Sequence, residues 1–261
     1  MALADRFDGL LVDLDGVVWI GREPVPGSAE TLQALLEAGK RIVFVTNNPG
    51  KLPAAYAERL RELGVEVGEE QIVTAGIVAA RLAGEAAGAG GGAFVIGAAP
   101  LKEMVAATGA RLLEGEEAWE VKAVVVSGHR GFDYGELLTA KRALERGAAL
   151  FATSHDPTMP YPGGELPGTG AVLAAVETAS GVRAEIAGKP ERHLFEMARA
   201  ALGGRESVAM IGDRLSSDIA GGRAAGLETI LVLSGTTSRE EAAAASPPPD
   251  FVLDDLSGLL A

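Results

Sequence analysis

Short apolar segments alternate with helical patterns along most of the chain, and this alternation limits the folds that the chain can adopt. Five largely apolar segments span residues 9–15, 41–47, 71–75, 207–213 and 227–235. A strand that is apolar on both sides must be covered on both faces, and parallel strands need crossover connections, which are usually helices. The pattern therefore predicts an α/β protein in which helices cover both faces of a doubly wound parallel sheet, giving three layers.

Helical periodicity follows most of these segments. Apolar residues recur at helical spacing in residues 28–39, 52–64, 76–88, 192–203 and 215–226. Ser28 is a candidate N-cap for the first of these helices, and Gly39 is a candidate end. A last short strand is expected at residues 251–256.

The middle of the chain breaks the pattern. The Gly-rich segment 88–93 is a candidate hinge or domain boundary, and a second αβ series follows it as far as about Val182. The simplest arrangement is one domain inserted into another. We therefore expect a core domain of residues 1–80 and 186–261 and an inserted cap domain of residues 81–185. The glycines expected to form turns in the cap are Gly163, Gly164 and Gly168.

Composition excludes several classes of function. The 261 residues carry a formal net charge of −13, which disfavours nucleic acid and anionic membrane surfaces as partners. There is no cysteine, so disulfides, a thiolate nucleophile and thiolate metal sites are excluded. The first residues include Asp5 and Asp8 and do not resemble a secretory signal, and no apolar run approaches the roughly 18 residues of a membrane span. We therefore expect a cytoplasmic protein.

Two acidic residues, Asp13 and Asp15, follow the first apolar run, and Gly16 comes next. Side chains at positions i and i+2 of a strand project to the same side. Two carboxylates held close together repel each other, which raises one pKa unless a cation lies between them. Ligands of parallel α/β sheets bind beyond the carboxyl ends of the strands, where this pair lies. A turn or a helix cap explains one of the two residues more readily than it explains the pair.

Polar residues also stand at three further places where a predicted strand ends or a predicted helix begins. They are Thr46 and Asn47 after the second apolar segment, Lys189 ahead of a helix, and Asp213 with Asp218 after a later strand. Each has an ordinary structural interpretation, since Thr, Asn and Asp form caps and turns and most lysines are exposed. Such capping accounts for Asp213 or Asp218 alone better than for both.

Taken in order, these residues resemble the motif set of the haloacid dehalogenase superfamily of aspartate-nucleophile phosphotransferases. The set reads Asp-x-Asp-Gly, Thr-Asn, Lys and Gly-Asp-x4-Asp, and its specificity lies in the order of the four pieces. The stretches DLDGVVWIGREPVPGSAE, FVTNNPG, LPGTGA, GKP and IGDRLSSDIAGGRAAG are similar to the branch of p-nitrophenyl, phosphoglycolate and pyridoxal phosphate phosphatases (subclass IIA). The resemblance covers nearly the whole chain and implies a Rossmann-like core with a large αβ cap.

The resemblance implies a two-step phosphoryl transfer. In such a reaction Asp13 attacks phosphorus to form an aspartyl-phosphate, and Asp15 protonates the leaving alcohol and then deprotonates the attacking water. Thr46 and Asn47 are expected to hold phosphate oxygens by hydrogen bonds. Lys189 is expected to place a positive charge beside the phosphate and the nucleophile. An acid two residues after the nucleophile favours a phosphatase over the related ion pumps and dehalogenases.

The resemblance also implies Mg²⁺ as the cation between the acidic residues. The implied ligands are the carboxylates of Asp13 and Asp213 and the backbone carbonyl of Asp15. Asp218 is expected to position a metal-bound water or Lys189. Mg²⁺ prefers oxygen ligands and keeps several waters beside one or two carboxylates and a substrate phosphate.

Substrate choice is expected to depend on the cap. Candidate contacts are His129, Arg130, His155 and Asp156, each of which also fits an ordinary surface or loop position. The chain departs from the branch here, since His129 stands where an Asp is common and Ser154-His155-Asp156 where Asn-x-Asp is common. These departures leave the catalytic set intact but remove the basis for transferring one particular substrate.

The function expected from these residues is the Mg²⁺-dependent hydrolysis of small phosphomonoesters, with a small phosphorylated metabolite as substrate. Two alternatives stay open. One is a phosphotransferase or phosphomutase on the same fold, and the other is a non-catalytic protein that binds a phosphorylated metabolite. The resemblance is also compatible with a homodimer formed through the cap.

Overall fold

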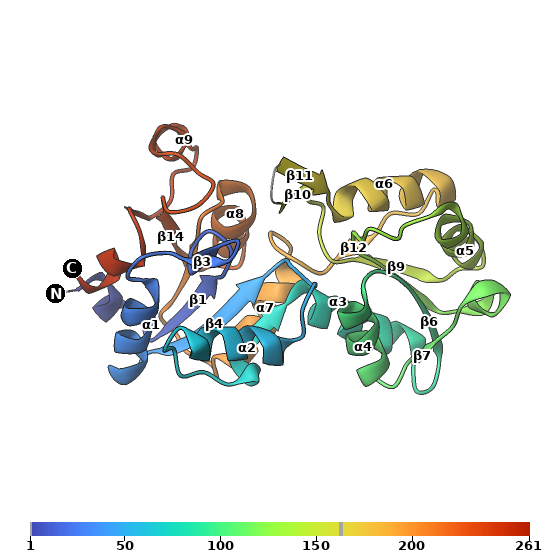
Figure 1. Ribbon diagram of the computed structural model, residues 1–261, viewed down its shortest axis with the longest axis horizontal. Coiled ribbons are helices and arrows are strands. Elements are labelled where there is room, and N and C mark those ends of the chain that lie inside the picture. The colour runs from blue at the N-terminus through green and yellow to red at the C-terminus, as the bar shows by residue number, and fades with distance from the viewer. Residues whose placement is uncertain (1, 162–163) are drawn as a thin grey trace. The chain divides into compact units, whose positions relative to one another are not determined.

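The computed structural model describes residues 2–161 and 164–261 (Figure 1). The chain divides into two compact units. Unit 1 comprises Met1–Thr46, Pro53–Val73 and Lys189–Ala261, and unit 2 comprises Asn47–Leu52 and Thr74–Gly188. Gly163, one of the expected turn residues, lies outside the described residues.

Unit 1 is built on a six-stranded sheet with the strand order β15-β14-β13-β1-β4-β5. The neighbouring pairs from β15 through β4 are parallel. The predicted α/β class with a parallel sheet is therefore confirmed. The strands are β1 (Gly9–Asp13), β4 (Arg41–Thr46), β5 (Ile72–Thr74), β13 (Val208–Gly212), β14 (Glu228–Val232) and β15 (Phe251–Leu253), with a separate hairpin of β2 (Trp19–Ile20) and β3 (Glu23–Pro24).

Helices cover both faces of this sheet. Leu10 and Val12 of β1 belong to one hydrophobic cluster with residues of α1 and α2. On the other face, Leu11 pairs with Met210 of β13, which lies close to Gly222 of α8, and α7 contacts both β4 and α8. All five positions of β1 are buried because the strand lies between these layers. The helices of unit 1 are α1 (Ser28–Glu37), α2 (Pro53–Glu62), α7 (Arg192–Ala201), α8 (Ala220–Ala224) and α9 (Arg239–Ala244).

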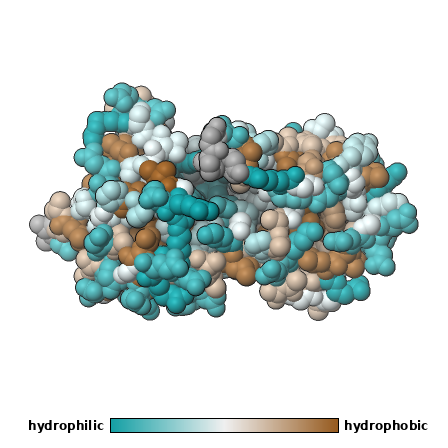
Figure 2. All heavy atoms as spheres, viewed as in Figure 1, coloured by the Kyte–Doolittle hydropathy of each residue, from teal (hydrophilic) through white to brown (hydrophobic). Residues whose placement is uncertain are grey.

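The amphipathic pattern of α2 explains how it docks. Tyr56, Ala57 and Leu60 are buried, whereas Glu58 and Glu62 are exposed. Hydrophilic residues cover the outer side of α1 and α2 in the view of Figure 2. The apolar stripe of such a helix supplies most of its stability when it packs against a sheet.

Several predicted boundaries differ from the structure, and hydrogen bonds explain two of the differences. The helix α1 begins at Ser28, whose hydroxyl donates to Val18 O at 3.0 Å, so Gly27 occupies the N-cap position instead. The last strand ends at Leu253, because Asp255 accepts a hydrogen bond from the backbone N–H two residues on and begins a short helical turn.

Unit 2 contains a second parallel sheet, with the order β12-β9-β8-β6-β7. The helix α3 belongs to this unit, so the predicted boundary between residues 80 and 81 falls inside it. The Gly-rich segment 88–93 leads from α3 into β6 within unit 2. The elements are α3 (Ala75–Ala87), β6 (Gly92–Ile96), α4 (Ala99–Ala107), β7 (Arg111–Leu112), β8 (Ala123–Val126), α5 (Tyr134–Glu145), β9 (Ala149–Ala152), β10 (Thr158–Tyr161), β11 (Gly164–Pro167), α6 (Thr169–Ser180) and β12 (Glu185–Ile186). In the part of the chain that the structure describes, no helix has the length and apolar character needed to cross a membrane.

Candidate active site

Polar side chains meet where three neighbouring strands of unit 1 end. Asp13 is the last residue of β1 and pairs in register with Val45 of β4, so Thr46 follows at the same edge of the sheet. On the other side of β1, Asp213 comes directly after the end of β13. Asp13 is only 6% exposed. This is the edge at which parallel α/β sheets bind their ligands.

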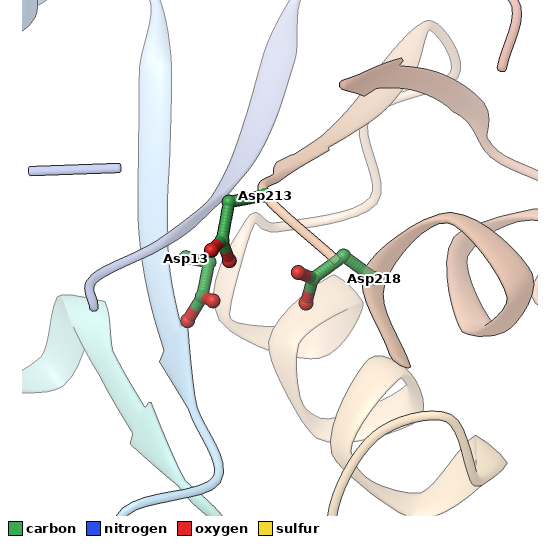
Figure 3. A group of neighbouring side chains, drawn as sticks. All are labelled: Asp13, Asp213 and Asp218. Atoms are coloured by element: carbon green, nitrogen blue, oxygen red, sulfur yellow. The ribbon is translucent and has the colours of Figure 1, made fainter. Parts of the chain in front are cut away.

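Three buried carboxylates gather at this edge. One oxygen each of Asp13, Asp213 and Asp218 lies within 4.8 Å of the other two, and the three side chains converge (Figure 3). Asp213 is 1% exposed and Asp218 is fully buried. Negative charges this close repel each other strongly away from water, so the group requires positive charge beside it.

A wide helical turn aims Asp218 at the group. Leu215–Ile219 form a π-helical turn, where the sequence predicts the α-helical start of segment 215–226. Asp218 Oδ2 accepts a hydrogen bond from Arg214 N at 3.0 Å. A Cβ at Gly212 would overlap the Asp218 side chain, so glycine allows the turn to approach the strand end. Such π turns are frequent at functional sites.

Lys189 supplies positive charge to the group. Its side chain is 3% exposed, and its Nζ lies 2.8 Å from Asp13 Oδ1 and 2.7 Å from Asp218 Oδ1. The ordinary interpretation of this lysine as an exposed residue is therefore wrong. Asp213 takes no part in these two ion pairs, so one ammonium group does not balance three carboxylates.

The pKa values of the group reflect this burial. Burial raises the pKa of Asp13 well above its ordinary value of 3.8, and the charges of Asp218 and Asp213 add to the effect, although Lys189 opposes it. Burial and the charge of Asp218 also raise the pKa of Asp213, although the hydrogen bond from the Thr236 N–H lowers it. Burial alone lowers the pKa of Lys189, but the carboxylates of Asp13 and Asp218 outweigh it, so this pKa is raised. The lysine therefore stays charged, and the carboxylates retain protons to a higher pH unless another cation neutralises them.

Asp213 has one oxygen that is held and one that is not. Its Oδ2 accepts a hydrogen bond from Thr236 N at 2.6 Å. Its Oδ1 is buried and, among the described residues, has no hydrogen-bond partner. A buried carboxylate oxygen without a donor is costly, and it has the chemistry of a ligand for a hard cation. A Cβ at Gly16 or at Gly235 would overlap this carboxylate, so both glycines make room for it.

Replacing Gly16 by Ala should displace Asp213 and weaken divalent-cation binding by at least about tenfold. Gly16 has φ +90°, and its Cβ would meet the Asp213 carboxylate. The matched control is Gly64→Ala, because Gly64 also has φ +90° but nothing lies within 4 Å of its added Cβ. Both variants should lose about 1–2 kcal/mol of unfolding free energy from the positive φ. Metal titrations that give equal affinities for the two variants would contradict the expected role of Asp213 as a metal ligand.

Asp15 lies apart from the buried group. It is exposed, and its Oδ1 accepts a hydrogen bond from Trp19 Nε1 at 3.0 Å. Burial and the charge of Asp15 raise the pKa of Tyr56, with a smaller contribution from Asp13. The Tyr56 phenol therefore stays neutral beside these carboxylates.

The two residues expected to bind phosphate together belong to different units. Thr46 ends β4 in unit 1 and is 2% exposed. Asn47 belongs to unit 2, where its Nδ2 donates to Asp156 Oδ2 at 3.4 Å. Gly188 lies so close to Asn47 that a Cβ there would overlap the Asn47 side-chain oxygen. A joint role of Thr46 and Asn47 in binding phosphate stays a prediction.

The four cap residues have different surroundings within unit 2. His129 Nε2 lies 2.8 Å from Oε2 of Glu136, a residue in the first turn of α5. Arg130 and His155 are exposed, and Asp156 is partly buried. Contact of these residues with a substrate stays a prediction.

Sequence reasoning does not identify Trp19, Gly235 or Thr236 as parts of the site. A signal exists for the last two, because they follow β14, which pairs with β13, at the same edge of the sheet as Asp213. Trp19 stands four residues after Asp15, but nothing in the sequence indicates that the indole N–H turns toward the carboxylate.

Comparison with known families gives two matches. A family model for haloacid dehalogenase-like hydrolases matches residues 10–111, and a second model, described as HAD-hydrolase-like, matches residues 186–259. The first range contains Asp13, and the second contains Lys189 and Asp213. The two matches together therefore span the residues that meet at the strand ends.

Individual relatives are similar over most of their length. A glycerol-3-phosphate phosphatase from Homo sapiens is 38% identical, over 91% of this chain and 82% of the relative. A crystal structure of a glycerol phosphate phosphatase from Mycobacterium tuberculosis in complex with magnesium superposes with a TM-score of 0.91 at 35% identity, over 100% of this chain and 78% of that one. The p-nitrophenyl phosphatase from Archaeoglobus fulgidus gives a TM-score of 0.89 at 33% identity, over 97% and 98% of the two chains.

Proposed function

The chain belongs to the haloacid dehalogenase-like hydrolases, and from this premise we propose that it is a Mg²⁺-dependent phosphatase that hydrolyses small phosphomonoesters through an aspartyl-phosphate. The observation that carries the proposal is the buried group of Asp13, Asp213 and Asp218 with Lys189 at the strand ends of unit 1. Phosphoryl transfer needs mainly a positioned nucleophile and neutralised charge, and this group offers both.

Asp13 is the nucleophile in this proposal. Leu14 N and Lys189 Nζ both lie 2.8 Å from its Oδ1, which fixes the orientation of the carboxylate. The carboxylate oxygen forms a bond to phosphorus while the bond from phosphorus to the ester oxygen breaks, and Asp15 gives its proton to that oxygen. In the second step Asp15 takes a proton from water, the water oxygen attacks phosphorus, and the Asp13 carboxylate leaves.

The residues present fit a Mg²⁺ ion. Asp213 Oδ1 and Asp218 Oδ1 are both buried without a hydrogen-bond partner among the described residues, but Asp218 Oδ1 forms an ion pair with Lys189 Nζ at 2.7 Å and Asp218 Oδ2 accepts a hydrogen bond from Arg214 N. We therefore assign Asp13, Asp213 and the Asp15 carbonyl as the ligands, and Asp218 as the residue that holds Lys189. When bound, Mg²⁺ supplies positive charge for the carboxylates and for the phosphate oxygens. Thr46, Asn47 and Lys189 are the proposed phosphate-binding side chains.

The experiment that tests the proposal is magnesium-dependent release of phosphate from p-nitrophenyl phosphate. We expect turnover with Mg²⁺, loss of turnover in excess chelator, and full recovery when Mg²⁺ is restored. A folded chain that binds p-nitrophenyl phosphate but releases no phosphate would instead support a non-catalytic binding protein. Reaction in ¹⁸O-labelled water distinguishes hydrolysis from transfer to another alcohol, because phosphate that carries no label contradicts hydrolysis.

Added Mg²⁺ should raise the melting temperature more at neutral than at acidic pH. Because the pKa values of Asp13 and Asp213 are raised, these two residues hold more protons in the metal-free folded chain than in the unfolded chain over the interval between their ordinary and raised values. Their contribution to stability therefore falls as pH rises through that interval. Mg²⁺ binds the deprotonated carboxylates, so its stabilising effect grows over the same interval. Thermal melts at about pH 5 and about pH 7.5 measure the rise in melting temperature from chelator to Mg²⁺ at each pH. An equal rise at both pH values contradicts the assigned ligands.

The substrate is proposed to be a small phosphorylated metabolite selected by unit 2. Relatives named glycerol-3-phosphate phosphatase and chronophin are 36–38% identical to this chain, so glycerol 3-phosphate belongs in any substrate panel. His129, Arg130, His155 and Asp156 are the proposed specificity residues. Comparing kcat/KM over a panel of phosphorylated metabolites tests this, with alanine substitution of the exposed His155 expected to change the ranking of substrates.

A homodimer through unit 2 and a cytoplasmic location are also part of the proposal, with no nucleic acid or membrane partner. Tyr134 and Leu138 are exposed on α5 one turn apart, which is a surface that a second copy can cover. Light scattering of the Tyr134→Ser variant beside the unmodified chain tests the dimer.

A further inference from the structure

The hydrogen bond from Trp19 to Asp15 joins a buried residue to an exposed one. An exposed carboxylate rotates freely unless a partner holds it, and Asp15 is exposed. Trp19 Nε1 donates to Asp15 Oδ1 at 3.0 Å. An indole N–H can only donate, and a carboxyl oxygen can accept it whether or not the group carries a proton. This bond therefore fixes the direction of the Asp15 carboxylate.

The indole is itself held on several sides. Trp19 is fully buried, and in the β2–β3 hairpin it pairs with Pro24. The Tyr56 ring stacks on it, with ring centroids 6.5 Å apart and an angle of 5° between the planes, and Arg59 Cζ lies 3.9 Å from its centroid. Tyr56 and Arg59 are three residues apart on α2, so one face of that helix carries both. Arg59 Nη2 also donates to Gly21 O at 2.9 Å.

Backbone hydrogen bonds also hold together the segment that contains Asp15 and Trp19. Gly16 N donates to Trp19 O at 2.7 Å, and Trp19 N donates to Leu14 O at 3.3 Å. The chain therefore turns back on itself between Asp15 and Trp19, and the end of β1 sets the position of both residues. Side chain and backbone together leave the indole N–H little freedom to point elsewhere.

We propose that Trp19 is a positioning residue for proton transfer, because its buried N–H holds the Asp15 carboxylate in the orientation from which it protonates the leaving alcohol. The inference rests on the proposed role of Asp15 as acid and base. Catalytic groups must be held within about 0.5 Å and 10–20° of the productive geometry, and an unheld exposed carboxylate does not meet that requirement. Trp19 acts through Asp15 and does not itself touch the reacting atoms.

Two substrates with different leaving groups distinguish a role of Trp19 in positioning Asp15 from a role in packing alone. A p-nitrophenolate ion departs without a proton, whereas the alkoxide of glycerol 3-phosphate needs one. The value of kcat/KM reports the steps up to departure of the leaving group, so the later hydrolysis of the common aspartyl-phosphate does not affect it. Damaged packing lowers kcat/KM for both substrates alike, whereas a misplaced Asp15 lowers it for the alkyl ester alone.

The test measures kcat/KM for both substrates in the full chain with Mg²⁺, and compares the ratio of p-nitrophenyl phosphate to glycerol 3-phosphate. In Trp19→Phe we expect this ratio to rise by at least about tenfold, and in Asp15→Asn by more. The control is Trp119→Phe in unit 2, where the indole also lies beside an arginine, Arg146, at 5.5 Å. Its ratio should stay within about twofold of the unmodified chain.

Two results overturn the inference in distinguishable ways. A raised ratio in Asp15→Asn with an unchanged ratio in Trp19→Phe removes the role of Trp19 and leaves the proposed function standing. An unchanged ratio in Asp15→Asn removes the role of Asp15 as acid, and with it the inference. If Trp19→Phe does not fold, benzothienylalanine at this position keeps the ring size and replaces the N–H by sulfur, and the same ratio is expected to rise.

Discussion

In Asp13→Asn, we expect kcat for p-nitrophenyl phosphate to fall by about 10⁴-fold or more while the chain stays folded. An amide oxygen does not form the aspartyl-phosphate, so both steps of the proposed reaction are lost. Asn has nearly the same shape as Asp, so the packing at the end of β1 is kept. The substitution also removes a buried carboxyl group, whose pKa is raised by burial and by the charges of Asp218 and Asp213. Steady-state kinetics measure the fall in kcat, and thermal melts on the same sample show whether the chain stays folded.

The matched control is Asp8→Asn, the same substitution next to the other end of β1. Asp8 is exposed and directly precedes Gly9, the first residue of the strand. We expect its kcat to equal that of the unmodified chain. Turnover in purified Asp13→Asn at more than about a hundredth of the unmodified rate would contradict the assignment of Asp13 as nucleophile.

In Lys189→Met, we expect the second large effect, a loss of about 3–5 kcal/mol of unfolding free energy at neutral pH in chelator. Methionine has a similar length, so it fills the space but leaves the carboxylates of Asp13 and Asp218 buried without their ion-pair partner. The deficit should shrink at acidic pH, because protonated carboxyls no longer need the ammonium group. Activity should fall together with stability, since the lysine also contacts Asp13, the proposed nucleophile. Urea unfolding at two pH values measures the change.

Two further variants show whether charge is the cause. Lys122→Met removes an exposed lysine of unit 2, and its unfolding free energy should change by less than about 0.5 kcal/mol. Adding Asp218→Asn to Lys189→Met removes one of the two unpaired carboxylates, so the double variant should regain part of the lost stability. A double variant less stable than Lys189→Met alone would mean that volume or hydrogen bonding, and not charge, sets the cost.

The sheet of unit 1 is predictable because the apolar residues that identify its strands lie within the strands themselves. Leu10, Leu11 and Val12 are apolar on both sides of the strand, which leaves a covered parallel sheet as the consistent arrangement. Since the carboxyl ends of parallel strands meet at one edge, Asp13 and Asp213 are expected together although 200 positions separate them. The resemblance to a known family adds the roles, which stay predictions, and Lys189 Nζ lies 2.8 Å from Asp13 Oδ1.

The parts that the sequence does not predict depend on contacts between distant segments. The π-helical turn that aims Asp218 depends on space left by Gly212, and the N–H that holds Asp213 comes from Thr236 after another strand. His129 turns toward Glu136, a residue of the following helix, and no periodic pattern encodes this pair. Local periodicity therefore predicts the elements and the edge where ligands bind, but not the partners of each side chain.

Trapping of the covalent intermediate tests the central claim most directly. In Asp15→Asn, p-nitrophenolate still departs but the attacking water lacks its base, so the phosphoryl group should accumulate on the chain. After an acid quench, peptide mass spectrometry is expected to find nearly one phosphoryl group per chain, on the peptide containing Asp13. The Asp13→Asn variant, treated alike, should carry none. Steady turnover with no phosphoryl group on the chain, or with one on any residue other than Asp13, would contradict the account.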